Sequence, residues 1–187
     1  MIRKSTMKEL SLHILDIIQN SITAKSSFIK IKIIEDLVND TYCIEIEDDG
    51  IGMDEELLKK VLDPFVTTRT TRKVGLGLPL FQASAIQCDG SFEIRSKLGT
   101  GTFVRAMFRH SHIDRPPLGN MADTIITCIM ANSSIDYFYE HYFKNNKFIF
   151  NTREVKEKIE ELPITDLSVI NWLKEYIKES LCVLVKT

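Results

Sequence analysis

The chain has 187 residues, of which 44% are hydrophobic and 27% are charged, and its formal net charge is −2. This composition is sufficient for one compact domain, or for a domain with a small appendage. Because acidic and basic residues nearly balance, there is no global basic field, which argues against nucleic acid as the main ligand.

The cysteines and the apolar runs indicate where the protein resides. Cys43, Cys88, Cys128 and Cys182 are far apart and lack Cys-x-x-Cys spacing, so we expect reduced thiols and a cytoplasmic protein. No uncharged stretch is long enough to span a bilayer, and no apolar signal core follows the basic residues at the start of the chain. Neither secretion nor membrane insertion is expected.

The first predicted element is a helix from about residue 7 to residue 24. Leu10, Ile14 and Ile17 recur at helical intervals, which is typical of a helix with one buried face. Thr6 and Glu9 have the spacing of a capping box, which predicts the helix start.

Strands and helices then alternate up to about residue 109. Alternating polar and apolar residues predict strands, and apolar residues at helical intervals predict helices. The predicted strands are residues 28–34, 42–47, 91–96 and 102–108, and the predicted helices are residues 54–62 and 76–88. Residues 63–74 lack apolar periodicity and are rich in Thr, Arg and Lys, which favours a mobile polar loop that could act as a lid.

A boundary is predicted at residues 114–119, where the sequence reads Asp-Arg-Pro-Pro-Leu-Gly. We therefore divide the chain into residues 1–114 and a smaller α+β extension, residues 115–187, of unknown role. In the extension we expect helices over residues 121–131, from Asn151 onward and over 167–180, and strands over 135–143 and 148–150.

Four short motifs follow one another in the first part of the chain. They are Asp-Ile-Ile-Gln-Asn at 16–20, Asp-Asp-Gly-Ile-Gly at 48–52, Val-Gly-Leu-Gly-Leu at 74–78 and Gly-Thr-Gly-Thr at 99–102. Each alone is common in turns and loops, but chance rarely sets all four in this order within about a hundred residues. Together they indicate a nucleotide site.

The first motif places Asp16 and Asn20 four residues apart, on one face of the first predicted helix. An amide oxygen can complete the oxygen shell of Mg²⁺, which keeps several waters and also binds triphosphate oxygens. Asp16 could orient or deprotonate an attacking water. The alternative is a polar surface stripe with a helix-capping role.

The second motif places a carboxylate at a strand end beside glycines. Asp48 could accept a hydrogen bond from an adenine amino group, while Gly50 and Gly52 let the backbone approach a ring closely. Met53 could form an apolar wall of the base site or simply fill the core. The alternative for the whole motif is a turn followed by a helix N-cap.

The third motif precedes a predicted helix, so the backbone N–H groups of Gly75 and Gly77 could bind phosphate. Arg69, Arg72 or Lys73 could add positive charge there, although a solvated loop is equally consistent with these residues. The chain has no Gly-x-x-x-x-Gly-Lys-Ser/Thr sequence and no complete dinucleotide fingerprint, which disfavours a P-loop or an NAD site.

A metal site at the end of the predicted strand 102–108 is not expected. His110 and His112 lie two residues apart, but no cysteine or carboxylate cluster accompanies them in the sequence.

Over residues 8–109 the four motifs resemble the boxes of the GHKL ATPase superfamily, which comprises gyrase B subunits, heat-shock chaperones, mismatch-repair ATPases and histidine kinases. In this comparison residues 16–20 match the N box, 48–52 the G1 box, 63–65 the F box, 74–78 the G2 box and 99–102 the last glycine box. The resemblance implies an α/β fold, the Bergerat two-layer sandwich, in which a mixed sheet backs helices around ATP and Mg²⁺. The whole chain also resembles small stand-alone bacterial histidine-kinase-like proteins.

The resemblance implies roles for individual residues. Asn20 would be the Mg²⁺ ligand, Asp48 the adenine-binding carboxylate, and Thr102 a neighbour of the adenine. Asp16 is the catalytic candidate, and the candidate ATP-binding residues are Asn20, Asp48, Gly50, Gly52, Met53, Thr67, Thr68, Arg69, Lys73, Gly75, Leu76, Gly77, Leu78 and Thr102.

Two residues depart from the family pattern. Asp16 stands where the family ATPases usually carry Glu, and this shorter side chain places the carboxylate farther from water. Val74 replaces the first glycine of the G2 box, which removes one freely approaching N–H group and stiffens the turn.

Three functions are consistent with these motifs. The first is an ATP-gated switch with slow hydrolysis. The second is the catalytic module of a histidine or serine kinase that phosphorylates a separate partner. The partner would be separate because His13 lies within the N-box helix and no acceptor domain is expected before it. The third is a nucleotide-binding regulatory module without turnover. A protein partner is expected in the first two, and a homodimer is compatible with all three.

Overall fold

The computed structural model describes residues 9–62, 76–160 and 162–186. The predicted polar loop at 63–74 therefore lies wholly outside the described residues. The elements are α1 (Leu10–Thr23), β1 (Phe28–Asp36), β2 (Thr41–Asp48), α2 (Glu55–Lys60), α3 (Gly77–Gln87), β3 (Ser91–Lys97), β4 (Gly101–Arg109), α4 (Met121–Ala131), β5 (Asp136–Phe143), β6 (Asn146–Asn151), α5 (Thr152–Ile159) and α6 (Leu167–Lys186).

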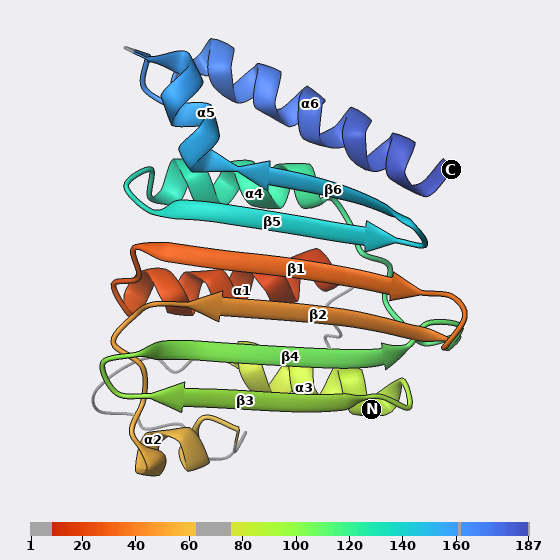
Figure 1. Cartoon of the computed structure of the whole chain (residues 1–187). Coiled ribbons are helices and arrows are strands. Elements are labelled where there is room, and N and C mark those ends of the chain that lie inside the picture. Colours follow the sequence, from red (N-terminus) through yellow and green to blue (C-terminus); the bar gives the residue numbers. More distant parts are fainter. Residues whose placement is uncertain (1–8, 63–75, 161, 187) are drawn as a thin grey trace, which may run out of the picture.

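The strands form one six-stranded sheet in the order β3-β4-β2-β1-β5-β6 (Figure 1). Four of the neighbouring pairs are antiparallel, whereas β1 and β5 run parallel with Ile31 opposite Tyr139. The sheet is therefore mixed, which confirms the predicted α/β class.

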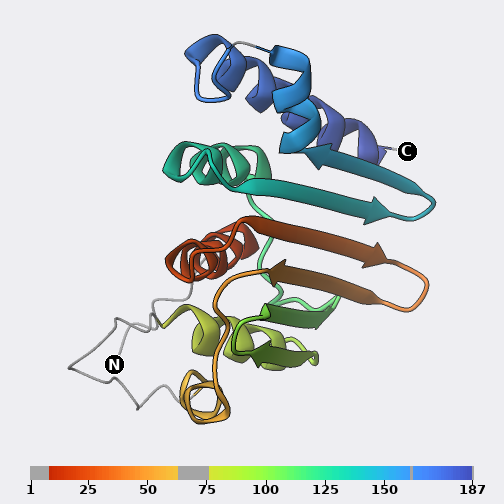
Figure 2. The same cartoon turned by 60° about the vertical axis from the view of Figure 1, so that its left-hand side comes forward.

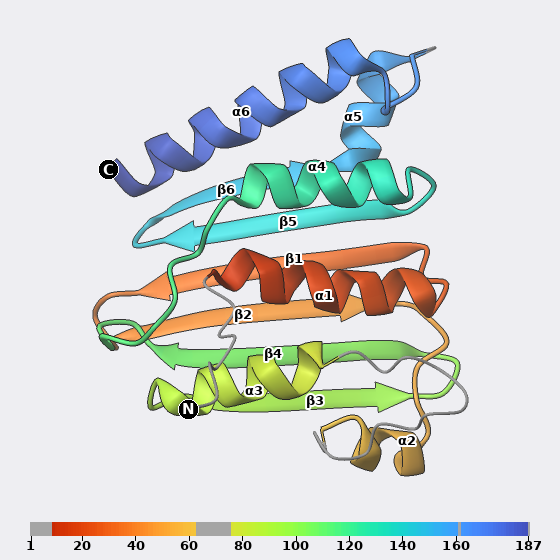
Figure 3. The ribbon, with the colours of Figure 1, turned by 180° about the vertical axis from the view of Figure 1, so that it is seen from behind.

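The helices α1, α3 and α4 cover one face of this sheet, as seen from behind in Figure 3, and Figure 2 shows α1 and α4 on the same side. Side chains alternate along each strand, so every second residue faces these helices. On β1 the inward residues are Ile29, Ile31 and Ile33, all at most 1% exposed. This apolar layer between helices and sheet is the core of the two-layer sandwich.

The opposite face of the sheet carries the intervening polar residues, and no helix covers it in Figure 1. Lys30 pairs with Glu140 at 3.0 Å, and Arg105 pairs with Glu45 at 2.6 Å. The Lys30 ammonium also lies 5.3 Å from the ring centre of Phe138. These contacts explain why the strands alternate between apolar and charged residues.

The part of the chain after residue 115 continues the same sheet instead of forming a separate one. β5 pairs with β1, and α6 packs on α4 and β6 through residues that include Leu173 and Ile177, both 0% exposed. α6 extends to Lys186, beyond the predicted end at Ser180, because Leu184 continues its buried face at 4% exposure. A separate unit after residue 115 stays a prediction.

The start of α1 differs from the capping-box prediction. The helix begins at Leu10, and Glu9 is an extended N-cap whose side chain accepts from Ser11 Oγ at 3.3 Å but caps no N–H group of the helix; Thr6 lies outside the described residues. Leu10 N donates instead to Pro117 O at 2.9 Å, and Ser11 N donates to Leu118 O at 2.8 Å. The carbonyl groups of the segment before α4 therefore accept from N–H groups of the first turn of α1. In most helices a capping side chain has this role.

A buried histidine on α1 leads to a testable pH dependence. His13 is 2% exposed and stacks on Phe81 of α3 at 5.1 Å, and burial lowers the pKa of His13 from 6.5 to about 4. Below pH 6.5 the unfolded chain therefore binds more protons than the folded one, so acid favours unfolding. Between pH 7 and pH 5 this histidine should lower the free energy of unfolding by about 2 kcal/mol.

Denaturant unfolding at the two pH values measures this effect. His13→Phe keeps a ring against Phe81 but cannot titrate, so it should lose about 2 kcal/mol less than the wild type over the same interval. An equal loss in both proteins would show that His13 is not the group responsible.

Candidate functional site

The base-binding side of the candidate site is built around Asp48 at the end of β2. Its carboxylate is 8% exposed and accepts from Ser21 Oγ at 2.6 Å, Ser26 Oγ at 3.2 Å and Gly50 N at 2.9 Å. No described cation pairs with it, so hydroxyl and amide donors alone replace its hydration. The carboxylate is therefore held in one orientation by α1, by the segment after α1 and by its own turn.

Glycines allow the backbone to close around this carboxylate. A side chain on Gly101, whose φ is +114°, would meet Asp48 O at 1.9 Å. A side chain on Gly52, with φ +65°, would meet Lys97 O at 2.0 Å. The second and last motifs therefore pack against each other, which explains their joint occurrence in the sequence.

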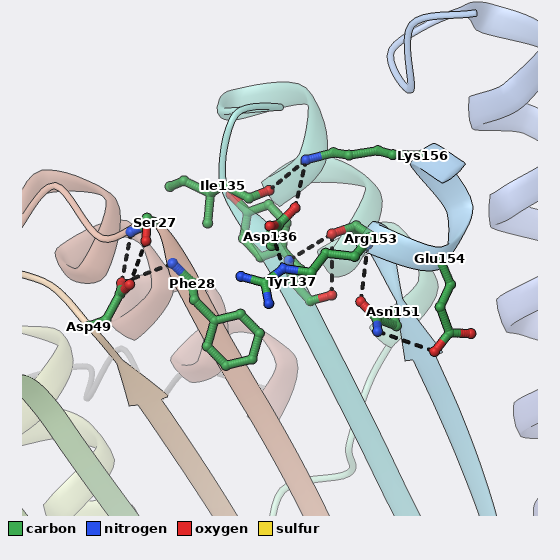
Figure 4. Close-up of polar contacts among 11 residues, drawn as sticks. Ser27, Phe28, Asp49, Ile135, Asp136, Tyr137, Asn151, Arg153, Glu154 and Lys156 are labelled. Carbon is green, nitrogen blue, oxygen red and sulfur yellow. Dashed lines mark hydrogen bonds and ion pairs between the residues drawn. The ribbon is translucent and has the colours of Figure 1, made fainter. Parts of the chain in front are cut away.

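The adjacent carboxylate, Asp49, has a different role. It accepts from Ser27 N at 2.7 Å and from Phe28 N at 2.9 Å, as Figure 4 shows. These bonds fix the start of β1 against the end of β2. Asp49 thus has a structural role at the start of β1, whereas Asp48 is the buried aspartate of the two.

Thr102 lies directly opposite Asp48 in the β2–β4 register. Its hydroxyl is 2.9 Å from Ser96 Oγ, and Met53 N donates to the same Ser96 oxygen at 2.9 Å. Met53 is half-buried against the core, which fits both of its predicted roles. The structure thus brings Asp48, Gly50, Gly52, Met53 and Thr102 together at one end of the sheet.

The phosphate side of the candidate site is formed by α1 and the start of α3. A Cβ added at Gly77, the first residue of α3, would lie 2.9 Å from Asp16 Cβ and 3.2 Å from Asp16 Oδ2. The absence of a side chain at Gly77 therefore lets α3 pack directly on Asp16. Asn20 follows one helical turn later on α1 and is exposed.

The start of α3 has the features of an anion site. Leu76 is the N-cap and makes no side-chain hydrogen bond to the helix, so among the described residues no capping side chain occupies the free N–H groups of the first turn. Leu78 is 6% exposed and anchors the helix, whereas Leu76 is 54% exposed. Pro79 lies in the first turn, as predicted from its compatibility with a helix start.

Two properties of α1 bear on chemistry at this position. Burial raises the pKa of the Asp16 carboxyl above its ordinary value, which makes it a better proton acceptor when ionised. The Asn20 side chain makes no hydrogen bond within the described residues, so its amide oxygen is available as a ligand. A single amide oxygen fits Mg²⁺, whose remaining ligands can be phosphate oxygens and water.

Several predicted site residues lie outside the described residues, namely Thr67, Thr68, Arg69, Arg72, Lys73, Val74 and Gly75. Of the two histidines after β4, His110 lies 3.0 Å from Glu35 and His112 lies 3.7 Å from Asp89, so they face different carboxylates. The described part of the chain contains no group of three or more His, Cys, Asp or Glu residues arranged to hold a metal.

The serines that hold Asp48 were not predicted from the sequence. Ser21 occupies a position where the period of Leu10, Ile14 and Ile17 calls for an apolar residue, and it is 2% exposed. A buried hydroxyl on the apolar face of a helix needs a partner. The polar residue at this apolar position was the signal in the sequence for a buried hydrogen bond of Ser21. It does not show that the partner is Asp48.

Ser21 yields a prediction about the candidate site. Ser21→Ala removes the shorter of the two hydroxyl bonds to Asp48 and should weaken ATP binding about tenfold, because the carboxylate loses its orientation. The control is Thr23→Ala on the same helix, because within the described part of the chain Thr23 Oγ1 bonds only to Gln19 O. This variant should leave affinity within about twofold. Calorimetric titration with ATP and Mg²⁺ measures both; equal affinities would contradict a positioning role for Ser21.

Comparison with known proteins agrees with this geometry. The family model described as histidine kinase-, DNA gyrase B-, and HSP90-like ATPase matches residues 7–112. This is more than half of the chain, and the chain therefore belongs to that family. The match confirms the predicted superfamily and supports binding of ATP.

Relatives and solved structures extend the comparison. The histidine-protein kinase AtoS of Escherichia coli is 38% identical over 89 residues, which are 47% of this chain and 14% of AtoS. Sporulation kinase C of Bacillus subtilis is 34% identical over 64 residues, 34% of this chain and 15% of that kinase. The chain thus spans only a small part of each of these relatives.

Among solved structures, the ATPase domain of Aquifex aeolicus MutL in complex with ADP is similar, with a TM-score of 0.54 and 13% identity over 83% of this chain and 68% of that one. At this identity the likeness concerns the fold. The matched share exceeds what residues 1–114 could supply, so the likeness reaches into the extension. Among the described helices, none has both the length and the apolar character needed to cross a membrane.

Proposed function

We propose that the chain binds ATP with Mg²⁺ and acts as an ATP-gated switch that hydrolyses ATP slowly. The observation that carries the proposal is the contact of Gly77 with Asp16, because it joins an uncapped helix start to the helix that bears Asn20. Asp48, with its three donors, lies at the end of the neighbouring strand β2. An adenine carboxylate, a phosphate-binding helix start and a Mg²⁺ ligand are the parts that an ATP site requires.

Each residue has one part in the proposed mechanism. Asp48 accepts a hydrogen bond from the adenine amino group, and its neighbours Ser21 and Ser26 keep it oriented. The free N–H groups at the start of α3 bind phosphate oxygens. Bound Mg²⁺, held by Asn20, would neutralise charge on the phosphates. Asp16, whose pKa is raised by burial, takes the proton of an attacking water.

The switch follows from the position of α3. Because Gly77 packs on Asp16, phosphate at the start of α3 acts on the contact between α1 and α3. Loss of the γ-phosphate removes a charge from that contact, and α3 can then shift against α1. A protein partner that recognises one of these two arrangements would read the nucleotide state.

A second candidate is the catalytic module of a protein kinase, which the kinase relatives favour. In that case the γ-phosphate would pass to a separate partner, since the same positioning of Mg²⁺ and phosphate serves transfer and hydrolysis. His13 does not suit the role of acceptor, because it is 2% exposed and stacked on Phe81.

Incubation with γ-labelled ATP and Mg²⁺ tests these alternatives when free phosphate and labelled protein are followed separately. The switch predicts slow release of free phosphate, lost in Asn20→Ala and Asp16→Ala, with ATP binding retained in Asp16→Ala. Transfer of label to an added partner protein would favour the kinase. Tight ATP binding that neither turns over nor responds to Asp16→Ala would favour a regulatory module without turnover, and undetectable ATP binding would contradict all three.

A further inference from the structure

A cavity in the extension shares no lining residue with the candidate ATP site. Its volume is about 440 Å³, and it lies between β6, α5 and α6. This volume is within the range of sites for small organic ligands. All its lining residues follow residue 112, where the family match ends, so membership in the family does not account for it.

One wall of the cavity is aromatic. Trp172 and Tyr176 are one turn apart on α6, with ring centres 5.5 Å apart and planes inclined by only 11°. They are 58% and 42% exposed, so this stacked pair leaves ring surface open to solvent. Val155 and Ile159 on α5 and Ile149 on β6 add apolar side chains. A planar aromatic ligand is the chemical complement of such a surface.

The charged groups of the cavity come from α5. Lys158 lines it and has no ion pair among the residues described. Glu154 also lines it, but its carboxylate accepts from Asn151 Nδ2 at 3.2 Å at the start of the helix (Figure 4). Basic neighbours on α5 are used elsewhere: Arg153 and Lys156 both pair with Asp136. Lys158 is thus the cation left for a ligand.

We propose that this cavity binds a small planar aromatic acid, with the ring against Trp172 and Tyr176 and the anionic group at Lys158. The apolar wall alone would bind neutral and acidic aromatic ligands equally well. The Lys158 ammonium favours the acidic ligands, because it can pair with their anionic group. The site is separate from the ATP site, and its occupation is measured independently of nucleotide.

The chain contains one tryptophan, so all tryptophan emission comes from the lining of this cavity, and the variants below establish where the probe binds. The probe is 1-anilinonaphthalene-8-sulfonate, a planar aromatic anion, added to the full chain in the presence of saturating ATP and Mg²⁺. We expect saturable binding at one site, with quenching of Trp172 emission by energy transfer to the probe. Probe fluorescence that rises without quenching of Trp172 would place the binding elsewhere and overturn the proposal.

Matched variants test the ligand class. Lys158→Met should weaken binding of the sulfonate probe about tenfold, whereas Lys178→Met, on the exposed side of α6 next to Glu175, should not. N-phenyl-1-naphthylamine, which lacks the sulfonate, should bind wild type and Lys158→Met equally. If Lys158→Met and Lys178→Met bind the sulfonate alike, the anion site does not exist.

A second variant guards against loss of folding. Ile149→Glu introduces a negative charge at a residue that is already 37% exposed, so the fold should tolerate it, and thermal unfolding checks this. We expect it to abolish sulfonate binding and to leave ATP affinity unchanged. Unchanged sulfonate binding in this variant would overturn the proposed location.

Discussion

Asp48→Asn should weaken ATP binding by about 3 kcal/mol, or about 100-fold. The substitution replaces one carboxylate oxygen by an amide nitrogen in a place surrounded by donors: Ser21 Oγ, Ser26 Oγ and Gly50 N. The new NH₂ group would face one of these donors or the adenine amino group, and in each case a buried donor has no acceptor. Calorimetric titration with ATP and Mg²⁺ measures the loss.

The control for this prediction is the neighbouring residue. Asp49→Asn makes the same chemical change one position further on, where the carboxylate accepts from Ser27 and Phe28 at the start of β1. It should lower thermal stability modestly and leave ATP affinity within about twofold. If the two variants lose affinity equally, the assignment of Asp48 as the adenine-binding carboxylate is wrong.

Truncation after residue 114 should prevent folding of the remaining chain. It would remove β5 from the edge of β1 and α4 from its contact with α1. It would also remove the Pro117 and Leu118 carbonyls that accept from Leu10 and Ser11. An exposed long strand with a row of unpaired backbone groups favours aggregation. We expect residues 1–114 to be insoluble or to unfold without cooperativity.

The complementary fragment provides the second arm of this experiment. Residues 115–187 added during refolding should restore soluble protein and ATP binding, because the contacts between the two parts are non-covalent. A fragment 1–114 that unfolds cooperatively and binds ATP like the whole chain would instead establish the predicted boundary as a domain boundary.

Local signals in the sequence were enough for most elements and for the surroundings of Asp48 at the candidate site. Asp48 at a strand end, and the strand that begins near Thr102, follow from alternation and turn residues, and the register places these two residues opposite each other. The joint occurrence of the motifs indicated that Asp48 and Thr102 belong to one site. Gly101 permits the close approach of the two strands, because it has no side chain.

Contacts between distant segments were not predictable in this way. The parallel pairing of β1 with β5 joins Ile31 to Tyr139, and no local pattern specifies which strand lies beside which. The predicted start of the first helix was too early for a related reason: Glu9 is its N-cap, and the carbonyl groups of Pro117 and Leu118 accept from its first N–H groups. Ser21 likewise bonds to a residue on another element, and its sequence neighbours do not reveal it.

The hydrogen bonds of Leu10 and Ser11 to Pro117 and Leu118 have a consequence for synthesis on the ribosome. Chains emerge from the amino end, so α1 leaves the exit tunnel long before its acceptors are made. Asp16 and Asn20 therefore lie on a helix whose start is completed by residues translated much later, and β1 waits about as long for β5. If the proposed function holds, nascent chains should gain the capacity to bind nucleotide only after β5 has been translated, which keeps shorter nascent chains from competing for ATP or for a partner.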